Sequence, residues 1–125
     1  MINEALGWLW VVIGFASGIL LGVRFQRDDW LGGYSAFPRR LIRLGHISFL
    51  GLGFLNILFA LSVGRLHLNS SQLLLTSWAL IAGAVTMPIC CFLTAWKRAS
   101  QPLFAVPVLC LVTGGILILA GLVAR

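Results

Sequence analysis

Charged residues are scarce in this chain of 125 residues. Aspartate and glutamate together number three, and charged residues make up 10% of the sequence, against about 25% in soluble domains. No charged residue lies deep within the long apolar runs of the chain. Proton-coupled pumps and transporters usually depend on an acidic residue or a proton relay inside the membrane. The composition therefore argues against that class of protein.

Catalytic motifs are lacking as well. The sequence has no catalytic triad, no glycine-rich phosphate loop and no H-E-x-x-H motif. Its candidate nucleophiles lie in apolar runs without a base beside them. We therefore expect that the protein is not an enzyme.

Cysteine is rare and lies in the wrong places for disulfide bonds. Cys90, Cys91 and Cys110 all fall within apolar runs. Neighbouring residues on a helix point about 100° apart, so Cys90 and Cys91 do not readily pair with each other. No disulfide framework follows from this pattern.

Long apolar segments dominate what remains. Apolar residues make up 60% of the chain and gather in four runs, Leu6–Val23, Leu44–Val63, Leu73–Ala95 and Pro102–Val123. A helix needs about 20 mostly apolar residues to cross the hydrocarbon core of a bilayer. The alternation of apolar and polar residues that marks membrane strands is absent. The first run follows an acidic residue, Glu4, rather than the basic region of a secretory signal, so we interpret it as a retained anchor.

The four runs predict an all-α integral membrane protein. We expect an antiparallel, up-down bundle of four transmembrane helices, because short connections make successive helices antiparallel. Residues 1–125 are expected to form a single transmembrane domain. Its helices should cover about residues 6–23, 42–63, 72–95 and 101–123, with a surface loop over residues 24–41.

Proline and serine residues predict local features of these helices. Pro38 is expected to open the second helix, where its missing N–H group needs no partner. Ser70 or Ser71 is expected to cap the third helix. Pro88 and Pro107 each remove a backbone hydrogen bond from a helix interior, so we expect a kink at both positions.

Positive charge is distributed unevenly between the predicted loops. Two positively charged residues lie in the predicted second loop and at the last position of the sequence, Arg65 and Arg125. Seven lie in the predicted first and third loops: Arg24, Arg27, Arg39, Arg40, Arg43, Lys97 and Arg98. The positive-inside rule then places loops 24–43 and 96–101 in the cytoplasm and both termini outside, in a bacterial inner membrane. The expected partners of these side chains are anionic lipid head groups, and no nucleic acid is expected.

Glycines at a spacing of four residues lie in the first apolar run. Gly14, Gly18 and Gly22 form two consecutive G-x-x-x-G motifs on one helix face. Glycines at this spacing allow two helices to approach closely. The motif predicts a packing groove that is filled either by another helix of the same bundle or by another subunit.

One histidine lies inside an apolar run and suggests two interpretations. A soft metal such as copper(I), or a haem, could use a set of side chains at similar depth, namely His46, Met87, Cys90 and Cys91. Alternatively, His46 reaches the membrane interface or bonds to Asp28 or Asp29 of the first loop. No cofactor is assigned from the sequence, and haem or copper is the alternative.

Polar uncharged residues occur near the middle of all four predicted helices. They are Ser17, Asn56, Thr86 and Thr113. Together they could form a polar layer that conducts a small neutral solute. Alternatively, Asn56 hydrogen-bonds across helices, and the hydroxyl groups bond to carbonyl groups of their own helices.

In length and helix number the chain is similar to the small multidrug resistance transporters, but residues 6–23 lack the membrane glutamate of that family. It is also similar in size to the dual-topology fluoride channels, but it lacks their phenylalanine- and threonine-rich signature and has a one-sided charge distribution. Neither function is carried over.

The expected function is that of a non-catalytic accessory or assembly subunit of a larger membrane protein complex, respiratory or otherwise engaged in electron transfer. Other membrane subunits are its expected partners. The alternatives are a haem- or copper-binding redox protein that uses His46 and a channel or transporter for a small neutral solute.

Overall fold

The computed structural model describes residues 1–124 as an all-helical chain, with no strand among them. Arg125, counted above among the positive charges, lies outside the described residues. The long helices are α1 (Ile2–Phe25), α2 (Phe37–Ser62), α3 (Ser70–Trp96) and α4 (Ala105–Val123), and the 3-10 helices are η1 (Trp30–Gly32), η2 (Val63–Arg65) and η3 (Arg98–Phe104). The prediction of four helices long and apolar enough to span a membrane is confirmed.

Helix boundaries differ from the predicted ones mainly at the N-terminal ends. α1 begins at Ile2 rather than near residue 6, because the residues that precede the first apolar run are also helical. α2 begins at Phe37 rather than near residue 42, with Pro38 in its first turn as expected. The connection between them is therefore shorter than the predicted loop 24–41. α4 begins later than expected, because residues 98–104 form a 3-10 helix.

Two local predictions were wrong. The cap of α3 is Asn69, not a serine: its side chain accepts a hydrogen bond from Gln72 N, and the Gln72 side chain accepts one from Asn69 N. This reciprocal pair is a capping box. Pro107 lies in the first turn of α4, where its missing N–H group breaks no helical hydrogen bond. Pro88 lies inside α3, which continues without a break from Ser70 to Trp96.

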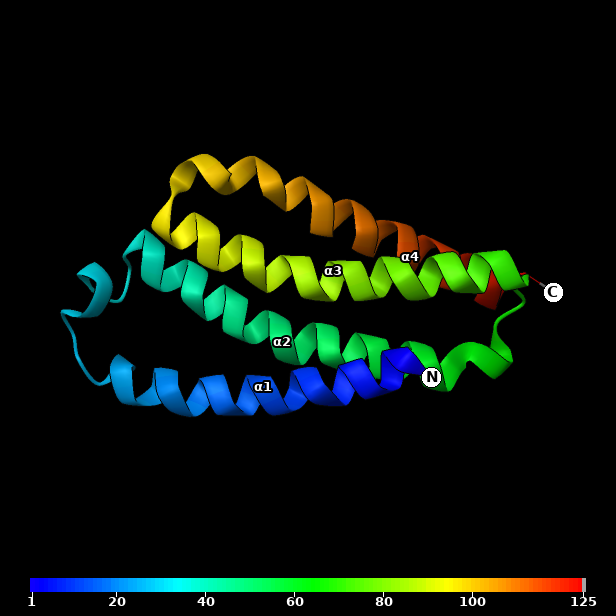
Figure 1. Cartoon of the computed structure of the whole chain (residues 1–125), viewed down its shortest axis with the longest axis horizontal. Helices are drawn as coiled ribbons and strands as arrows, with labels where there is room; N and C mark the ends of the chain where they lie inside the picture. The colour runs from blue at the N-terminus through cyan, green and yellow to red at the C-terminus, as the bar shows by residue number, and fades with distance from the viewer. Residues whose placement is uncertain (125) are drawn as a thin grey trace.

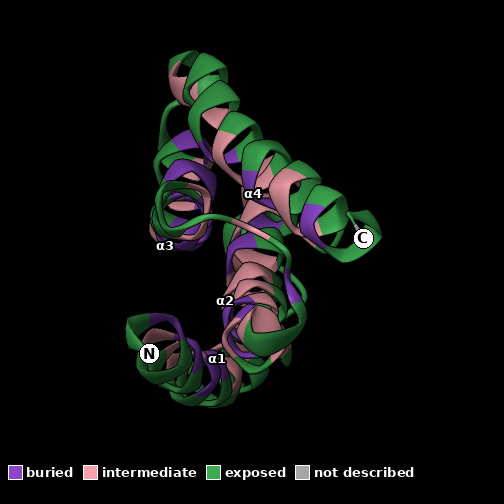
Figure 2. Ribbon diagram, turned by 90° about the vertical axis from the view of Figure 1, so that its right-hand side faces the viewer, coloured by how far each residue is buried: buried purple, intermediate pink, exposed green. Residues whose placement is uncertain are grey.

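The four helices lie alongside one another, and both termini are at the same end of the molecule (Figure 1). The main contacts join successive helices, with α1 on α2, α2 on α3 and α3 on α4. Seen along the helices, α1 and α4 lie at opposite edges, with α2 and α3 between them (Figure 2). The bundle is therefore open. In an apolar stretch of 18 residues within α3, 44% of the residues are buried. The corresponding share is only 11% in Arg98–Val123, which contains α4, so α3 is central and α4 is peripheral.

The α1–α2 contact depends on two glycines. A Cβ atom added at Gly7 would lie 2.6 Å from the carbonyl oxygen of Gly53, and one added at Gly53 would lie 2.8 Å from the carbonyl oxygen of Gly7. The two backbones touch here, since neither residue has a side chain to separate them. The contact cannot relax by moving a flexible side chain, because the obstructing atoms belong to the backbone.

Substitution of Gly7 by alanine is expected to destabilise the protein by about 1–3 kcal/mol, the usual cost of overpacking a closely packed site. The matched control is Gly22→Ala on the same helix, because nothing lies within 4 Å of a Cβ atom there. Alanine at Gly22 should be neutral or stabilising by up to about 1 kcal/mol, since alanine favours helix. Thermal unfolding in detergent measures both variants, and equal midpoints would contradict the close contact.

Candidate functional site

A buried polar cluster joins α1, α2 and α3. The Asn3 Nδ2 group donates to Asn56 Oδ1 at 2.9 Å and to the Ser77 carbonyl oxygen at 3.2 Å, and Ser77 Oγ donates to Asn3 Oδ1. Asn56 Nδ2 donates to the carbonyl oxygens of Leu52 and Leu80, at 2.9 Å and 3.4 Å. Both asparagines are completely buried. Asn56 therefore hydrogen-bonds across helices, and its amide has partners on both α1 and α3.

Sequence reasoning missed two members of this cluster and one related contact. Asn3 precedes the first apolar run and so lies outside the predicted helix, although an asparagine in a first helical turn can be paired with Asn56 by depth. Ser77 gave no signal that separates it from the other serines. Trp10 also links α1 to α3, because its indole N–H donates to the Ala84 carbonyl oxygen at 2.9 Å.

The expected polar layer of Ser17, Asn56, Thr86 and Thr113 is not assembled. Ser17 pairs with His46 instead. Thr86 Oγ1 donates to the Ala82 carbonyl oxygen of its own helix, and Thr113 is exposed on the outer surface of α4. Because the four side chains do not meet, they do not line a common path for a solute.

His46 lies at the α1–α2 interface. Its Nδ1 atom is 2.9 Å from Ser17 Oγ, and the Ser17 hydroxyl lies 3.0 Å from the Gly14 carbonyl oxygen. When the hydroxyl donates to that carbonyl group, Nδ1–H of His46 donates to Ser17. The imidazole therefore bonds to a serine of α1, and the expected bond to Asp28 or Asp29 is not formed.

The candidate metal ligands point to different interfaces. Cys91 lies on the α2–α3 contact, where its Cβ atom would be 3.2 Å from a Cβ atom added at Gly45. The Cys90 thiol donates to the Leu103 carbonyl oxygen of η3 at 3.5 Å. His46 instead faces α1. Within residues 1–124, no three His, Cys, Asp or Glu side chains form a group that could hold a metal ion. His46, Cys90 and Cys91 therefore lie in three different contacts.

The G-x-x-x-G face of α1 packs mainly on α2. A Cβ atom at Gly14 would lie 2.6 Å from Leu50 Cδ2, and one at Gly18 would lie 3.1 Å from His46 Cε1. Of the three glycines in the motif, Gly22 alone has no atom within 4 Å of an added Cβ atom. The interpretation in which another subunit fills this groove is therefore wrong at Gly14 and Gly18, because a helix of the same chain already occupies it.

Arg39 is not a head-group residue. Its side chain is buried, with only 2% of the residue exposed. One guanidinium nitrogen donates to the Phe25 carbonyl oxygen at 3.0 Å, and another donates to the carbonyl oxygens of Arg27 and Asp28 at 3.3 Å and 3.4 Å. The same group lies 4.5 Å from the centre of the Phe25 ring. Arg39 therefore caps the C-terminal end of α1, where a cation interacts favourably with the helix dipole.

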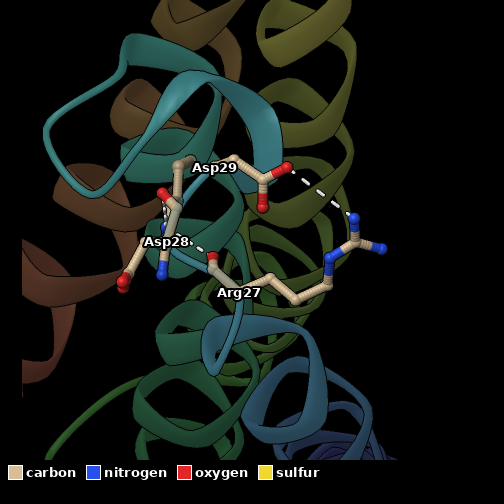
Figure 3. A network of polar contacts seen from close by, with 4 residues as sticks. Arg27, Asp28 and Asp29 are labelled. Atoms are coloured by element: carbon tan, nitrogen blue, oxygen red, sulfur yellow. Dashed lines mark hydrogen bonds and ion pairs between the residues drawn. The ribbon is translucent and has the colours of Figure 1, made fainter.

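The other positively charged residues are less buried. Arg27 pairs with Asp29 at 3.7 Å in the connection between α1 and α2 (Figure 3), and both side chains are largely exposed. An exposed pair of this kind contributes little to stability. Arg24, Arg40, Lys97 and Arg98 are exposed and Arg43 is half-buried, so these residues can still reach a lipid surface.

Comparison with known proteins does not identify a relative. No family model, curated protein or solved structure matches the chain.

The buried amide cluster predicts energetic coupling between Asn3 and Asn56. Asn3→Leu and Asn56→Leu should each destabilise the protein, because each leaves the other amide short of a partner in an apolar interior. A double-mutant cycle should give a coupling of about 0.6–1.7 kcal/mol, the range found for hydrogen bonds between membrane helices. Unfolding in mixed detergents measures it. Thr113→Val, at an exposed hydroxyl, is the control, and additive effects of the two asparagine variants would refute the coupling.

Proposed function

We propose that this chain is an integral membrane protein whose four helices cross the bilayer in antiparallel order. The contacts between α1 and α2 support opposite directions, since Gly7, Gly14 and Gly18 meet Gly53, Leu50 and His46 respectively, so that one series of residue numbers rises as the other falls. The outer faces support insertion. Large apolar side chains such as Phe15 and Ile19 are 63% and 72% exposed, and exposure to water costs about 25 cal/mol per Å² of apolar surface.

The proposed orientation places the positively charged connections in the cytoplasm and both termini outside, in a bacterial inner membrane. These connections share one end of the molecule, because the Arg98 guanidinium lies 4.3 Å from the centre of the Phe37 ring. Their combined positive charge favours the cytoplasmic side. A cysteine introduced by Ala99→Cys should react with an impermeant thiol reagent only in inverted vesicles. Reaction in intact spheroplasts would reverse the orientation.

Within the membrane, we propose that the protein is a non-catalytic accessory or assembly subunit of a larger complex. The observation that carries this proposal is the free surface of α4. Its buried residues are only Pro107, Gly114 and Gly121, and its only major helix partner is α3. On the outside it exposes the Thr113 side chain and an open glycine, Gly115. In hydrocarbon, small residues and hydroxyl groups favour contact with another helix.

A partner helix on this surface should be sensitive to a side chain at Gly115. We expect a defined membrane partner to co-purify in constant stoichiometry with the wild type in mild detergent. Gly115→Leu should release it, because leucine prevents close approach of a second backbone. Gly22→Leu is the matched control, since Gly22 also has nothing within 4 Å but lies on α1.

Both leucine variants should fold as the wild type does, since neither new side chain meets a neighbour in the chain. A partner retained by both variants would contradict docking on α4. A wild-type protein that purifies as a single component from native membranes would contradict the accessory function itself.

A second candidate is a haem-binding redox protein, and one observation favours it. The hydrogen bond between His46 Nδ1 and Ser17 orients the imidazole, and Nε2 makes no hydrogen bond within residues 1–124. Metal-ligating histidines are typically held in this way through their other nitrogen. A Soret absorption band in the purified protein that disappears in His46→Ala would favour this candidate. A colourless protein would eliminate it.

A further inference from the structure

An open groove of about 360 Å³ lies on one face of the first turns of α2. Two of its lining residues are arginines and four are apolar: Arg40, Arg43, Phe37, Leu41, Leu44 and Ile47. Residues three or four apart lie on the same helix face, so the two arginines share a face of α2 with the apolar residues. The groove is therefore positively charged on one side and apolar on the other.

The two arginines are available to a ligand. No ion pair in the described part of the chain involves Arg40 or Arg43: the two ion pairs there join Glu4 to the N-terminus and Asp29 to Arg27. Arg43 is also held in place, since its guanidinium lies 4.3 Å from the centre of the Tyr34 ring. They differ in this from Arg39, whose guanidinium is buried against the carbonyl groups at the end of α1.

The apolar side of the groove continues toward the middle of α2. Leu44 and Ile47 are 46% and 59% exposed. Gly51, one turn beyond Ile47, has nothing within 4 Å. This strip has no covering helix, and it leads from the arginines along the helix axis. Its shape and chemistry match a molecule that has an anionic end and a long apolar chain.

We propose that this groove binds one anionic glycerophospholipid. The phosphate group lies between Arg40 and Arg43, and an acyl chain follows Leu44, Ile47 and Gly51. Guanidinium groups bind phosphate oxygens through paired, charge-assisted hydrogen bonds. The proposal rests on the membrane insertion proposed above, because only then do the arginines lie at head-group level while the apolar strip faces hydrocarbon.

Native mass spectrometry of the purified protein tests the site. The probes are phosphatidylglycerol, phosphatidylcholine and inorganic phosphate. We expect one phosphatidylglycerol per chain, bound in preference to phosphatidylcholine. Arg40→Gln/Arg43→Gln should bind it roughly thirtyfold more weakly, from about 1 kcal/mol for each positive charge near an anionic head group.

The matched control is Arg24→Gln/Arg27→Gln, which removes the same charge at the same end of the molecule but outside the groove. It should keep wild-type affinity. Equal loss in both double variants would show a diffuse electrostatic field and overturn the site, as would equal binding of the two lipids. Displacement of the lipid by inorganic phosphate would assign the groove to a free anion.

Folding and insertion are checked separately. Leu44→Trp fills the apolar side of the groove without changing its charge, and it should also weaken phosphatidylglycerol binding. This variant keeps the site testable if the arginine variant does not fold. Unchanged binding in Leu44→Trp would overturn the proposed path of the acyl chain. Recovery of the wild type from the aqueous fraction would instead refute membrane insertion, which distinguishes failure of the proposed function from failure of the lipid site alone.

Discussion

The hydrogen bonds among Asn3, Asn56 and Ser77 join three helices at one end of the molecule, and the position of α1 depends on them. An unpaired amide in an apolar interior costs about 1–3 kcal/mol, so the helices must be in register for both asparagines to be satisfied. At the other end of α1, Arg39 binds the last carbonyl groups. Between these two polar anchors, glycines let α1 lie directly on α2. The helix is held at both ends by specific bonds and along its length by close packing.

The opposite edge of the bundle is built differently. α4 has no polar anchor comparable to that of α1, and its buried residues are two glycines and a proline. Gly114 and Gly121 receive the side chains of Leu80 and Leu68, and His67 N–H donates to the Gly121 carbonyl oxygen at 2.8 Å. This contrast is why we propose α4, rather than the glycine-rich α1, as the surface for another subunit. The glycines of α1 are largely used within the chain.

The seven positive charges near one end illustrate how burial separates residues that look equivalent in the sequence. Arg39 and Arg40 are neighbours, yet one is buried against the connection and the other is exposed. A helix rotates about 100° per residue, so adjacent side chains face different surroundings. The same rotation separates Gly45, which contacts Cys91, from His46, which contacts Ser17. Residues at similar depth can therefore face different neighbours.

Hydrophobicity alone was sufficient to predict four long helices, because a run of about 20 apolar residues has few other stable forms. The missing N–H group of proline was sufficient to place Pro38 in a first turn, and the apolar run around Asn56 was sufficient to place that residue in an interior position. Residue spacing did not determine which helix faces meet. The depth of a residue along its helix specifies neither the rotation of that helix about its axis nor the helix that lies beside it. Only the tertiary structure paired Asn3 with Asn56, buried Arg39, directed His46 toward Ser17 and left Thr113 outside. Each of these outcomes is decided by contacts between residues far apart in the chain, which the local sequence does not specify.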